Sequence, residues 1–282
     1  PAIRSAVLTG PGSCGAFYMA EDGISLRAPG FCNVNQLFDA NTEQAKRIEV
    51  IRGPGTAIHG SNALNGVVNV ISQSPSNSRE TSLALEAGAN DYSRIKASTS
   101  DSHGRHSYVI YANGSHDGGF KDDSGYDQQK LNMRYNYDAD RWQLQSGLSL
   151  QNLNQETAGF LRQGEEAYKD DNLKDLNENP EAYRDSQSAR AYTRFEMRGI
   201  NDEILVITPY VRHTKMAFLQ HFLPGTPLEE NGQSSIGMQT GFYHQYSKNV
   251  KIHNGFDIDY TQAWLKQSQE GTTFTSFPSG DQ

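Results

Sequence analysis

Two cysteines are the first residues whose type could carry chemistry. Cys14 and Cys32 both lie in segments rich in Gly, Pro and Asn. They are either two separate reduced thiols or one disulfide in an oxidising compartment, and the loop context favours the disulfide. Such a bond would contribute about 3 kcal/mol by restricting the unfolded chain. Zinc binding or thiol catalysis would need partners at ligand spacing, and neither a Cys-x-x-Cys pair nor a nearby His supplies them.

Carboxylates are densest in the segment 161–185, which holds eight Asp or Glu residues against four Lys or Arg residues. Four of them could bind calcium: Asp170, Asp171, Asp175 and Glu178. Their spacing does not match the Asp-x-Asp/Asn-x-Asp/Asn-Gly pattern of an EF-hand. We therefore favour a solvated, partly helical loop and expect no metal site.

No sequence pattern indicates an enzyme. The chain has no Gly-x-Ser-x-Gly, no His-Glu-x-x-His and no phosphate-binding glycine loop. Its carboxylates are too scattered to identify a glycosidase pair. We expect neither a catalytic site nor a cofactor, and with a formal net charge of -8 we expect no nucleic-acid partner.

The composition leaves a membrane location open. Only 35% of the 282 residues are apolar, and no run reaches the roughly 18 apolar residues of a transmembrane helix. A membrane β-strand needs only alternate residues to be apolar. The chain opens without Met or a signal peptide, and both ends resemble internal cuts, so we give missing targeting signals little weight.

The character of the sequence changes near Ser72. Earlier residues form short apolar runs broken by glycine, with a hairpin signal at Asp22-Gly23 and strands expected at 47–51 and 67–71. The segment 72–79 reads as a linker. The first region therefore predicts a small mixed α/β unit with long loops.

The second region alternates apolar and polar residues in long segments. Strands are expected at 81–89, 93–100, 105–115, 126–137, 141–152, 188–198, 203–214, 235–246 and 250–261. One face is apolar, as at Leu148 and Leu150, and the other carries charges such as Arg190. A soluble sandwich and a membrane barrel both produce this alternation.

The connections favour the membrane barrel. Tight turns are expected at 101–104, 138–140, 199–202 and 247–249, and most of the intervening connections are long. Outer-membrane barrels combine short periplasmic turns with long extracellular loops. Tyr137, Trp142 and Tyr246 lie beside tight turns, either as an interfacial aromatic girdle or as ordinary strand-end aromatics.

One stretch is specific to a family. Residues 47–71 begin Arg-Ile-Glu-Val-Ile-Arg-Gly-Pro, pass through His-Gly-Ser and end Gly-Val-Val-Asn-Val-Ile. This resembles the plug-domain signature of TonB-dependent outer-membrane receptors, and the resemblance is dense over Gly10 to Ser74. His59 stands where the family usually has an aromatic ring. We favour a packed ring over a metal ligand there.

The resemblance implies a mainly β fold: a fragment of a 22-stranded transmembrane antiparallel β-barrel, preceded by a small mixed α/β plug domain. Residues 1–78 would be the C-terminal part of the plug. Residues 79–282 would be about nine N-terminal strands of an incomplete barrel. Barrels of this size have a plugged lumen.

The resemblance also implies contacts between plug and barrel. On the plug side we expect Glu49 and Arg52, with inward-facing Arg190, Arg194 and Glu196 as partners on the wall. The alternative is that Glu49 and Arg52 simply face solvent on a half-buried strand.

Substrate would bind between plug apex loops and extracellular loops, as in the family. Two segments, 10–17 and 27–35, resemble apex loops, and the disulfide between Cys14 and Cys32 would join them. Six residues are candidates for ligand contact: Arg27, Phe31, Asn33, Phe160, His221 and Phe222. They could equally well pack their own loops.

The implied function is TonB-dependent active transport of a nutrient chelate across the bacterial outer membrane, most often a ferric siderophore in this family. Cobalamin, haem and glycans are alternative cargoes. A passive porin-like channel and a secreted all-β enzyme are competing functions. The expected partners are TonB with its inner-membrane energy complex, outer-membrane lipid and a small-molecule metal chelate.

Overall fold

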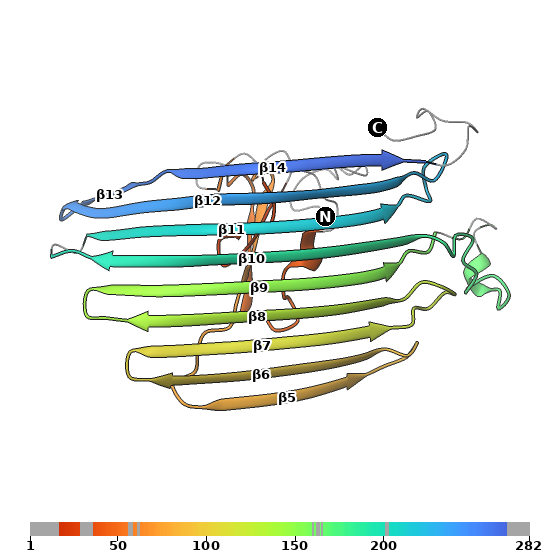
Figure 1. The fold of residues 1–282 in the computed structure, drawn as a ribbon, viewed down its shortest axis with the longest axis horizontal. Helices are drawn as coiled ribbons and strands as arrows, with labels where there is room; N and C mark the ends of the chain where they lie inside the picture. The colour runs from red at the N-terminus through yellow and green to blue at the C-terminus, as the bar shows by residue number, and fades with distance from the viewer. Residues whose placement is uncertain are drawn as a thin grey trace.

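The chain forms two β-sheets in a computed structural model, a small one and a large one. The structure describes residues 17–28, 36–55, 59–60, 63–159, 161, 164, 166–200 and 203–269. The described residues between 17 and 72, here called the inner unit, lie against one face of the large sheet, here called the wall (Figure 1). Within the described residues, no helix is both long enough and apolar enough to cross a membrane.

The inner unit is built on a four-stranded sheet in the order β2-β1-β4-β3. Its elements are β1 (Phe17–Glu21), β2 (Ile24–Ser25), the 3-10 helix η1 (Gln36–Asp39), β3 (Arg47–Arg52) and β4 (Gly66–Ile71). Asp22 and Gly23 both have positive φ, as a tight two-residue hairpin requires, so the hairpin predicted there is present. The apolar core is small and has two clusters: Tyr18, Ala20, Ala63 and Val67, and Leu26, Ala40 and Val70.

The wall is a ten-stranded antiparallel sheet that does not close on itself within the described chain. Its strands are β5 (Glu80–Ala87), β6 (Ser93–His103), β7 (His106–Asp117), β8 (Tyr126–Asp138), β9 (Trp142–Glu156), β10 (Tyr183–Arg198), β11 (Ile204–Leu219), β12 (Leu228–Ser247), β13 (Val250–Asn254) and β14 (Asp257–Ser268). Both β13 and β14 pair with β12, so together they form a ninth interrupted strand. A second 3-10 helix, η2 (Ala167–Lys169), lies in the long loop between β9 and β10.

The connections alternate in length as the sequence predicted. Tight turns join β6 to β7, β8 to β9, β10 to β11 and β12 to β13, all at one end of the wall (Figure 1). At the opposite end, the connection 88–92 between β5 and β6 is no longer than the turn 199–203, but the other connections are longer, and the segment between β9 and β10 is the longest of them within the wall. We call these the tight-turn end and the long-loop end.

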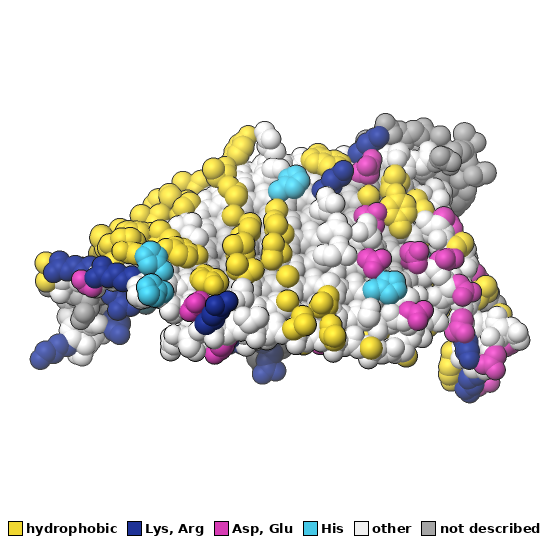
Figure 2. Space-filling model, turned by 60° about the horizontal axis from the view of Figure 1, so that its bottom comes forward, with side chains coloured by type: hydrophobic (Ala, Val, Ile, Leu, Met, Phe, Trp, Pro, Cys, Tyr) yellow, Lys and Arg dark blue, Asp and Glu magenta, His cyan; other side chains and the backbone are white. Residues whose placement is uncertain are grey.

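Side chains alternate across the wall with a period of two. Residues such as Leu150 and Val211 point outward and are exposed, whereas Arg190 and Arg212 point inward and are buried. Figure 2 shows apolar side chains gathered toward the tight-turn end of the outer face, with Asp and Glu toward the long-loop end. This pattern of an apolar exterior and a polar interior is that of an outer-membrane barrel.

Aromatic rings form a row on the outer face near the tight turns. The Trp142 ring lies 4.9 Å from that of Tyr137 and 5.8 Å from that of Phe195, between ring centroids. Tyr246 is also exposed at this end. Such a row is what an interfacial girdle requires.

Candidate functional site: the contact between the inner unit and the wall

The register of the wall arranges its inward-facing polar residues in transverse rows, one residue from each strand. The central row contains Tyr111, Asn132, Ser149, Arg190, Arg212 and Ser235. The upper row, two residues closer to the long-loop end, contains Asn113, Lys130, Gln151, Ser188, Thr214 and Gln233. All twelve side chains are buried.

A buried ion pair joins the inner unit to the central row. Arg190 on β10 and Glu21 at the end of β1 are only 4% and 5% exposed as side chains, and their Nη2 and Oε2 atoms are 2.5 Å apart. The same Nη2 donates to the backbone carbonyl of Asp39 at 2.7 Å. Asn132 on β8 donates to the other carboxylate oxygen of Glu21 at 3.1 Å. Two wall strands therefore hold one carboxylate of the inner unit.

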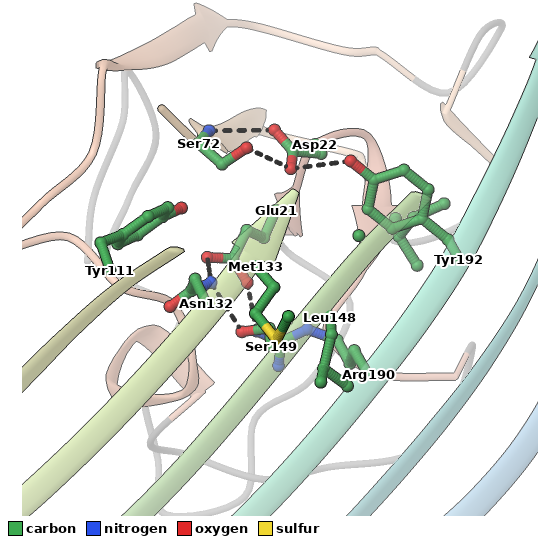
Figure 3. Close-up of a pocket in the computed structure, with 12 residues that line it drawn as sticks. Glu21, Asp22, Ser72, Tyr111, Asn132, Met133, Leu148, Ser149, Arg190 and Tyr192 are labelled. Atoms are coloured by element: carbon green, nitrogen blue, oxygen red, sulfur yellow. Dashed lines mark hydrogen bonds and ion pairs between the residues drawn. The ribbon is translucent and has the colours of Figure 1, made fainter. Parts of the chain in front are cut away.

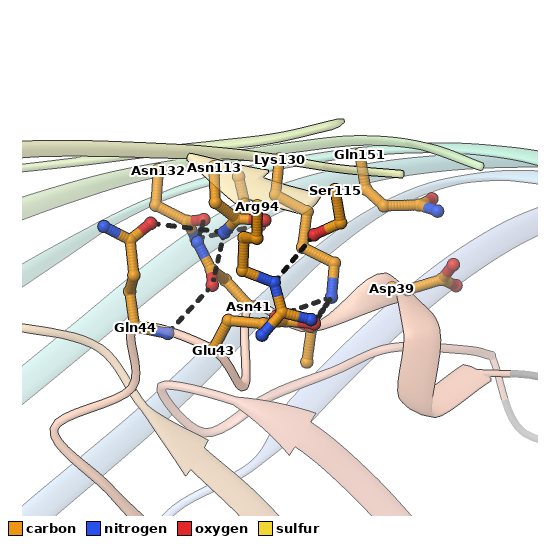
Figure 4. A network of polar contacts seen from close by, with 12 residues as sticks. Asp39, Asn41, Glu43, Gln44, Arg94, Asn113, Ser115, Lys130, Asn132 and Gln151 are labelled. Carbon is orange, nitrogen blue, oxygen red and sulfur yellow. Dashed lines mark hydrogen bonds and ion pairs between the residues drawn. The ribbon is translucent and has the colours of Figure 1, made fainter. Parts of the chain in front are cut away.

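The loop after η1 is held by polar side chains of the wall (Figure 4). Asn41 donates to Asn132 Oδ1 at 2.9 Å and accepts from Asn113 Nδ2 at 3.1 Å. Lys130 Nζ donates to the carbonyl of Ala40 at 2.8 Å and pairs with Glu43 at 2.9 Å. Because backbone and side-chain groups are both used, this loop has a fixed register against β7 and β8.

The β1–β2 hairpin makes a third attachment. Tyr192 on β10 donates its hydroxyl to Asp22 Oδ2 at 3.0 Å, and Ser72 donates to the same oxygen at 2.6 Å (Figure 3). Arg212 on β11 donates to the carbonyl of Ser25 at 3.0 Å. Arg212 also forms an ion pair with Asp259 on β14. A small cavity at this junction is lined by Asp22, Tyr192 and other residues of both units.

Burial changes the acidity of one carboxyl group at this contact. Burial raises the pKa of Asp39 from 3.8 to about 6. The positive charges of Arg190 and Lys130 act in the opposite direction, and the negative charge of Glu21 adds to the increase. Asp39 therefore holds its proton more strongly where the inner unit meets the wall than it would in water.

Only one of the residues predicted to join plug and barrel is found at the contact between the inner unit and the wall. Arg190 reaches the inner unit, but its partner there is Glu21. Glu49 pairs instead with Arg47 at 2.7 Å, and Arg52 is exposed on the same strand. In the described chain, neither residue forms a hydrogen bond or an ion pair with the wall. The physical reason is the sheet order, because β3 is the edge strand on the side away from the hairpin that meets the wall.

Arg194 and Glu196 also differ from the expected pairing. They lie inward on β10 but closer to the tight turns, where Arg194 and Glu196 are 3.5 Å apart. Arg198 approaches Glu196 at the same distance. Both pairs connect residues of the wall to each other, with Arg194 and Arg198 largely exposed.

Three candidate ligand residues lie outside the described chain: Phe31, Asn33 and Phe160. Both cysteines of the predicted disulfide, Cys14 and Cys32, also lie outside it. Arg27 is buried, and its Nη2 donates to the carbonyl of Phe17 at 3.3 Å. Burial lowers the pKa of Arg27.

His221 and Phe222 follow β11 at the long-loop end, with ring centroids 5.6 Å apart. Phe222 lies on Phe218 of β11 at 5.8 Å. His59 packs on Tyr18 at 5.1 Å between ring centroids, as a ring in place of another ring would.

Four residues at this contact were not predicted from the sequence: Glu21, Asp39, Lys130 and Arg184. Arg184 lies on β10 near the long-loop end, and its guanidinium carbon is 5.3 Å from the Phe38 ring centre and 5.6 Å from that of Phe218. Its inward direction could have been predicted, because Arg184 lies an even number of residues before Arg190 and residues two apart on a strand share a face.

Comparisons with known proteins agree with this architecture. Residues 7–67 match the family model described as the TonB-dependent Receptor Plug Domain. Vitamin B12 transporter BtuB from Vibrio vulnificus (strain CMCP6) is 32% identical over 96 residues, which cover 33% of this chain and 15% of that protein.

Solved structures share the fold of nearly the whole chain. Ferric citrate transporter FecA in its unliganded form has a TM-score of 0.80 at 13% identity, with 97% of this chain and 42% of that chain covered. The ferripyoverdine receptor of the outer membrane of Pseudomonas aeruginosa has a TM-score of 0.75 at 13% identity, with 96% and 39% covered. The ferric-catecholate import receptor Fiu from E. coli K12 has a TM-score of 0.68 at 15% identity, with 95% and 45% covered. This chain therefore spans less than half the length of each of these relatives.

Proposed function

We propose that this chain, which belongs to the TonB-dependent outer-membrane receptors, takes part in TonB-dependent import of a ferric siderophore across the outer membrane. The inner unit is the plug, the wall is part of the barrel, and we place their boundary between residues 78 and 79. TonB and its inner-membrane energy complex are the proposed source of the force on the plug.

The observation that carries this proposal is the polar attachment of the plug. Arg190, Lys130 and Asn132 hold it through ion pairs and hydrogen bonds. Polar groups of this kind can replace their protein partners with water when the plug moves. Exposing an apolar surface to water costs much more free energy. An attachment of this kind suits a plug that has to move and return.

The cargo is proposed from chemistry and from the neighbours. Receptors for ferric citrate, ferripyoverdine and ferric catecholate share the fold. The match to the vitamin B12 transporter makes cobalamin the second cargo to test. On the protein side, we place Arg27, His221 and Phe222 near the cargo, with Phe31, Asn33 and Phe160 as further candidates. Transport by this mechanism requires no covalent chemistry.

The test is uptake by the complete receptor in cells that lack their other receptors. Radiolabelled iron is supplied as ferric citrate, a ferric catecholate and a ferric hydroxamate, with haem and cobalamin as separate arms. We expect saturable uptake of one iron chelate that disappears when TonB is deleted. Equal uptake with and without TonB would instead support a passive channel, and uptake of no iron chelate would overturn the siderophore proposal.

A further inference from the structure

The upper row is attached to the plug on two sides, with a gap between them. On one side Asn113 on β7 donates to Asn41 at 3.1 Å, and Lys130 on β8 donates to the plug carbonyl of Ala40 at 2.8 Å. Four strands away, Gln233 on β12 accepts from the backbone N–H of Ala28 at 2.9 Å and donates to the carbonyl of Leu26 at 3.3 Å. The three residues between these anchors make no hydrogen bond to the described part of the plug.

Those three residues are neighbours across adjacent strands, and within the described chain each has a buried side-chain oxygen without a hydrogen-bond partner. Gln151 pairs with Ser188 across β9 and β10, and Ser188 pairs with Thr214 across β10 and β11. Gln151 Oε1, Ser188 Oγ and Thr214 Oγ1 are all buried without a hydrogen-bond partner in the described structure. A buried unsatisfied polar group costs roughly 1–3 kcal/mol, so three neighbours of this kind are unfavourable for folding alone. Such groups need an explanation outside the packing of the protein.

An uncompensated positive charge lies on the same face, closer to the long-loop end. Arg184 precedes Ser188 by four residues on β10, which corresponds to about 13 Å along a strand. Its guanidinium lies against Phe38 of the plug and Phe218 of the wall, and it donates to Gln155. Its Nε atom is buried without a partner, and no carboxylate of the described chain forms an ion pair with it. Aromatic contacts stabilise a guanidinium but do not neutralise it.

We propose that Arg184, Gln151, Ser188 and Thr214 form a binding track on the wall for an anionic, oxygen-rich cargo. Arg184 supplies the counter-charge for an anionic group of the cargo at the long-loop end. The Ser188 and Thr214 hydroxyls donate to its oxygen atoms, and Gln151 Oε1 accepts from its hydroxyl or amide groups. Cargo bound there lies between the two plug anchors. This inference rests on the proposed transport function and adds where on the wall the cargo passes and which charge it carries.

Thiol modification tests the track without requiring the cargo to be known. Ser188→Cys and Thr214→Cys are made separately in the complete receptor, and each is treated in TonB-containing cells with two methanethiosulfonate reagents of similar size. One carries a sulfonate and the other a trimethylammonium group. Each modification rate is divided by the rate at which the same reagent modifies a small free thiol. The rate measured with the parent receptor, which keeps Cys14 and Cys32, is subtracted as background. Ala189→Cys is the matched control, because Ala189 is next on the same strand and alternates to the outer face.

We expect both track variants to react at least tenfold faster with the anionic reagent than with the cationic one. Adding Arg184→Gln should bring that ratio close to one, and Ala189→Cys should react slowly with both reagents. Reaction at positions 188 and 214 no faster than at 189, or a ratio unchanged by Arg184→Gln, would overturn the track. If one cysteine variant fails to assemble, the other reports the same quantity. Failure of the transport proposal is recognised separately, because the wild-type receptor would then import no chelate of the panel.

Discussion

Replacing Asp39 with asparagine should hold the plug more tightly against the wall at neutral pH. Asp39 is buried beside Arg190 and Lys130, yet burial outweighs these charges and raises its pKa from 3.8 to about 6. The difference of about 2 pKa units corresponds to about 3 kcal/mol, at 1.36 kcal/mol per unit. This is the upper limit of the penalty that the ionised carboxylate imposes on the docked plug, and asparagine does not ionise.

The pH dependence has a definite sign. Once the plug leaves the wall, we expect the pKa of Asp39 to return to its ordinary value near 3.8. Above pH 6 the group is ionised in both states, and the penalty is fully present. As the pH falls from 6 toward 4, the docked state takes up the proton first, so its stability increases. The stability of the docked plug in the wild type should therefore approach that in the variant as the pH falls through this window, and the two should be equal near pH 4.

Hydrogen–deuterium exchange of the β1 and β4 amides measures the plug attachment directly. The complete receptor and the Asp39→Asn variant are compared in micelles between pH 4 and 8, with intrinsic exchange rates divided out. At pH 7.5 the variant should exchange up to about a hundredfold more slowly, as 3 kcal/mol requires. Slower exchange in the wild type than in the variant at pH 7.5 would contradict this prediction. It would mean that Arg190 and Lys130 stabilise the carboxylate by more than burial penalises it.

Two further predictions concern the wall itself. Arg190→Ala should destabilise the plug attachment by about 3–5 kcal/mol, because it leaves Glu21 buried and unpaired, whereas Arg194→Ala should cost less than about 1 kcal/mol, because its pair is partly exposed. The same exchange experiment measures both, and equal effects would contradict this assignment. Gly237→Ala should lower the melting temperature of the receptor in micelles, because the added Cβ would lie 2.3 Å from the ring of Tyr210. Adding Tyr210→Leu should restore part of the loss, and a Gly237→Ala receptor that melts normally would show that the ring can move aside.

The strands of the wall could be predicted because alternation is a local signal. Their lengths could not, and the larger errors lie at the long-loop end. The strand expected at 141–152 continues to Glu156, and the one expected at 188–198 begins at Tyr183. The reason is visible on the outer face, where Asn152 and Asn154 replace apolar residues and form side-chain hydrogen bonds with Gln129 and Asp185. Backbone pairing continues there after the apolar pattern has ended.

For the contact between plug and wall, the sequence predicted the wall residue but not its partner on the plug. The inward direction of Arg190 follows from its position on an alternating strand. Its partner depends on which edge of the plug sheet approaches the wall, and that is a property of the sheet order. The family motif drew attention to Glu49 and Arg52 on β3, whereas the carboxylate that meets the wall is Glu21 in the β1–β2 hairpin. No local pattern distinguishes Glu21 from any other acid beside a turn.

The distribution of apolar and polar contacts would allow one plug to be both stable and removable, as the proposed transport requires. The plug encloses its own apolar clusters, so little apolar surface needs to be exposed when it separates from the wall. Its attachments are mainly hydrogen bonds, whose net contribution is about 1 kcal/mol each because water replaces them. The two buried ion pairs, Arg190 with Glu21 and Lys130 with Glu43, are different, since separating either leaves two charges to be solvated in a narrow lumen. Resistance to removal should therefore concentrate at these two pairs, and force applied elsewhere on the plug should release the weaker attachments first.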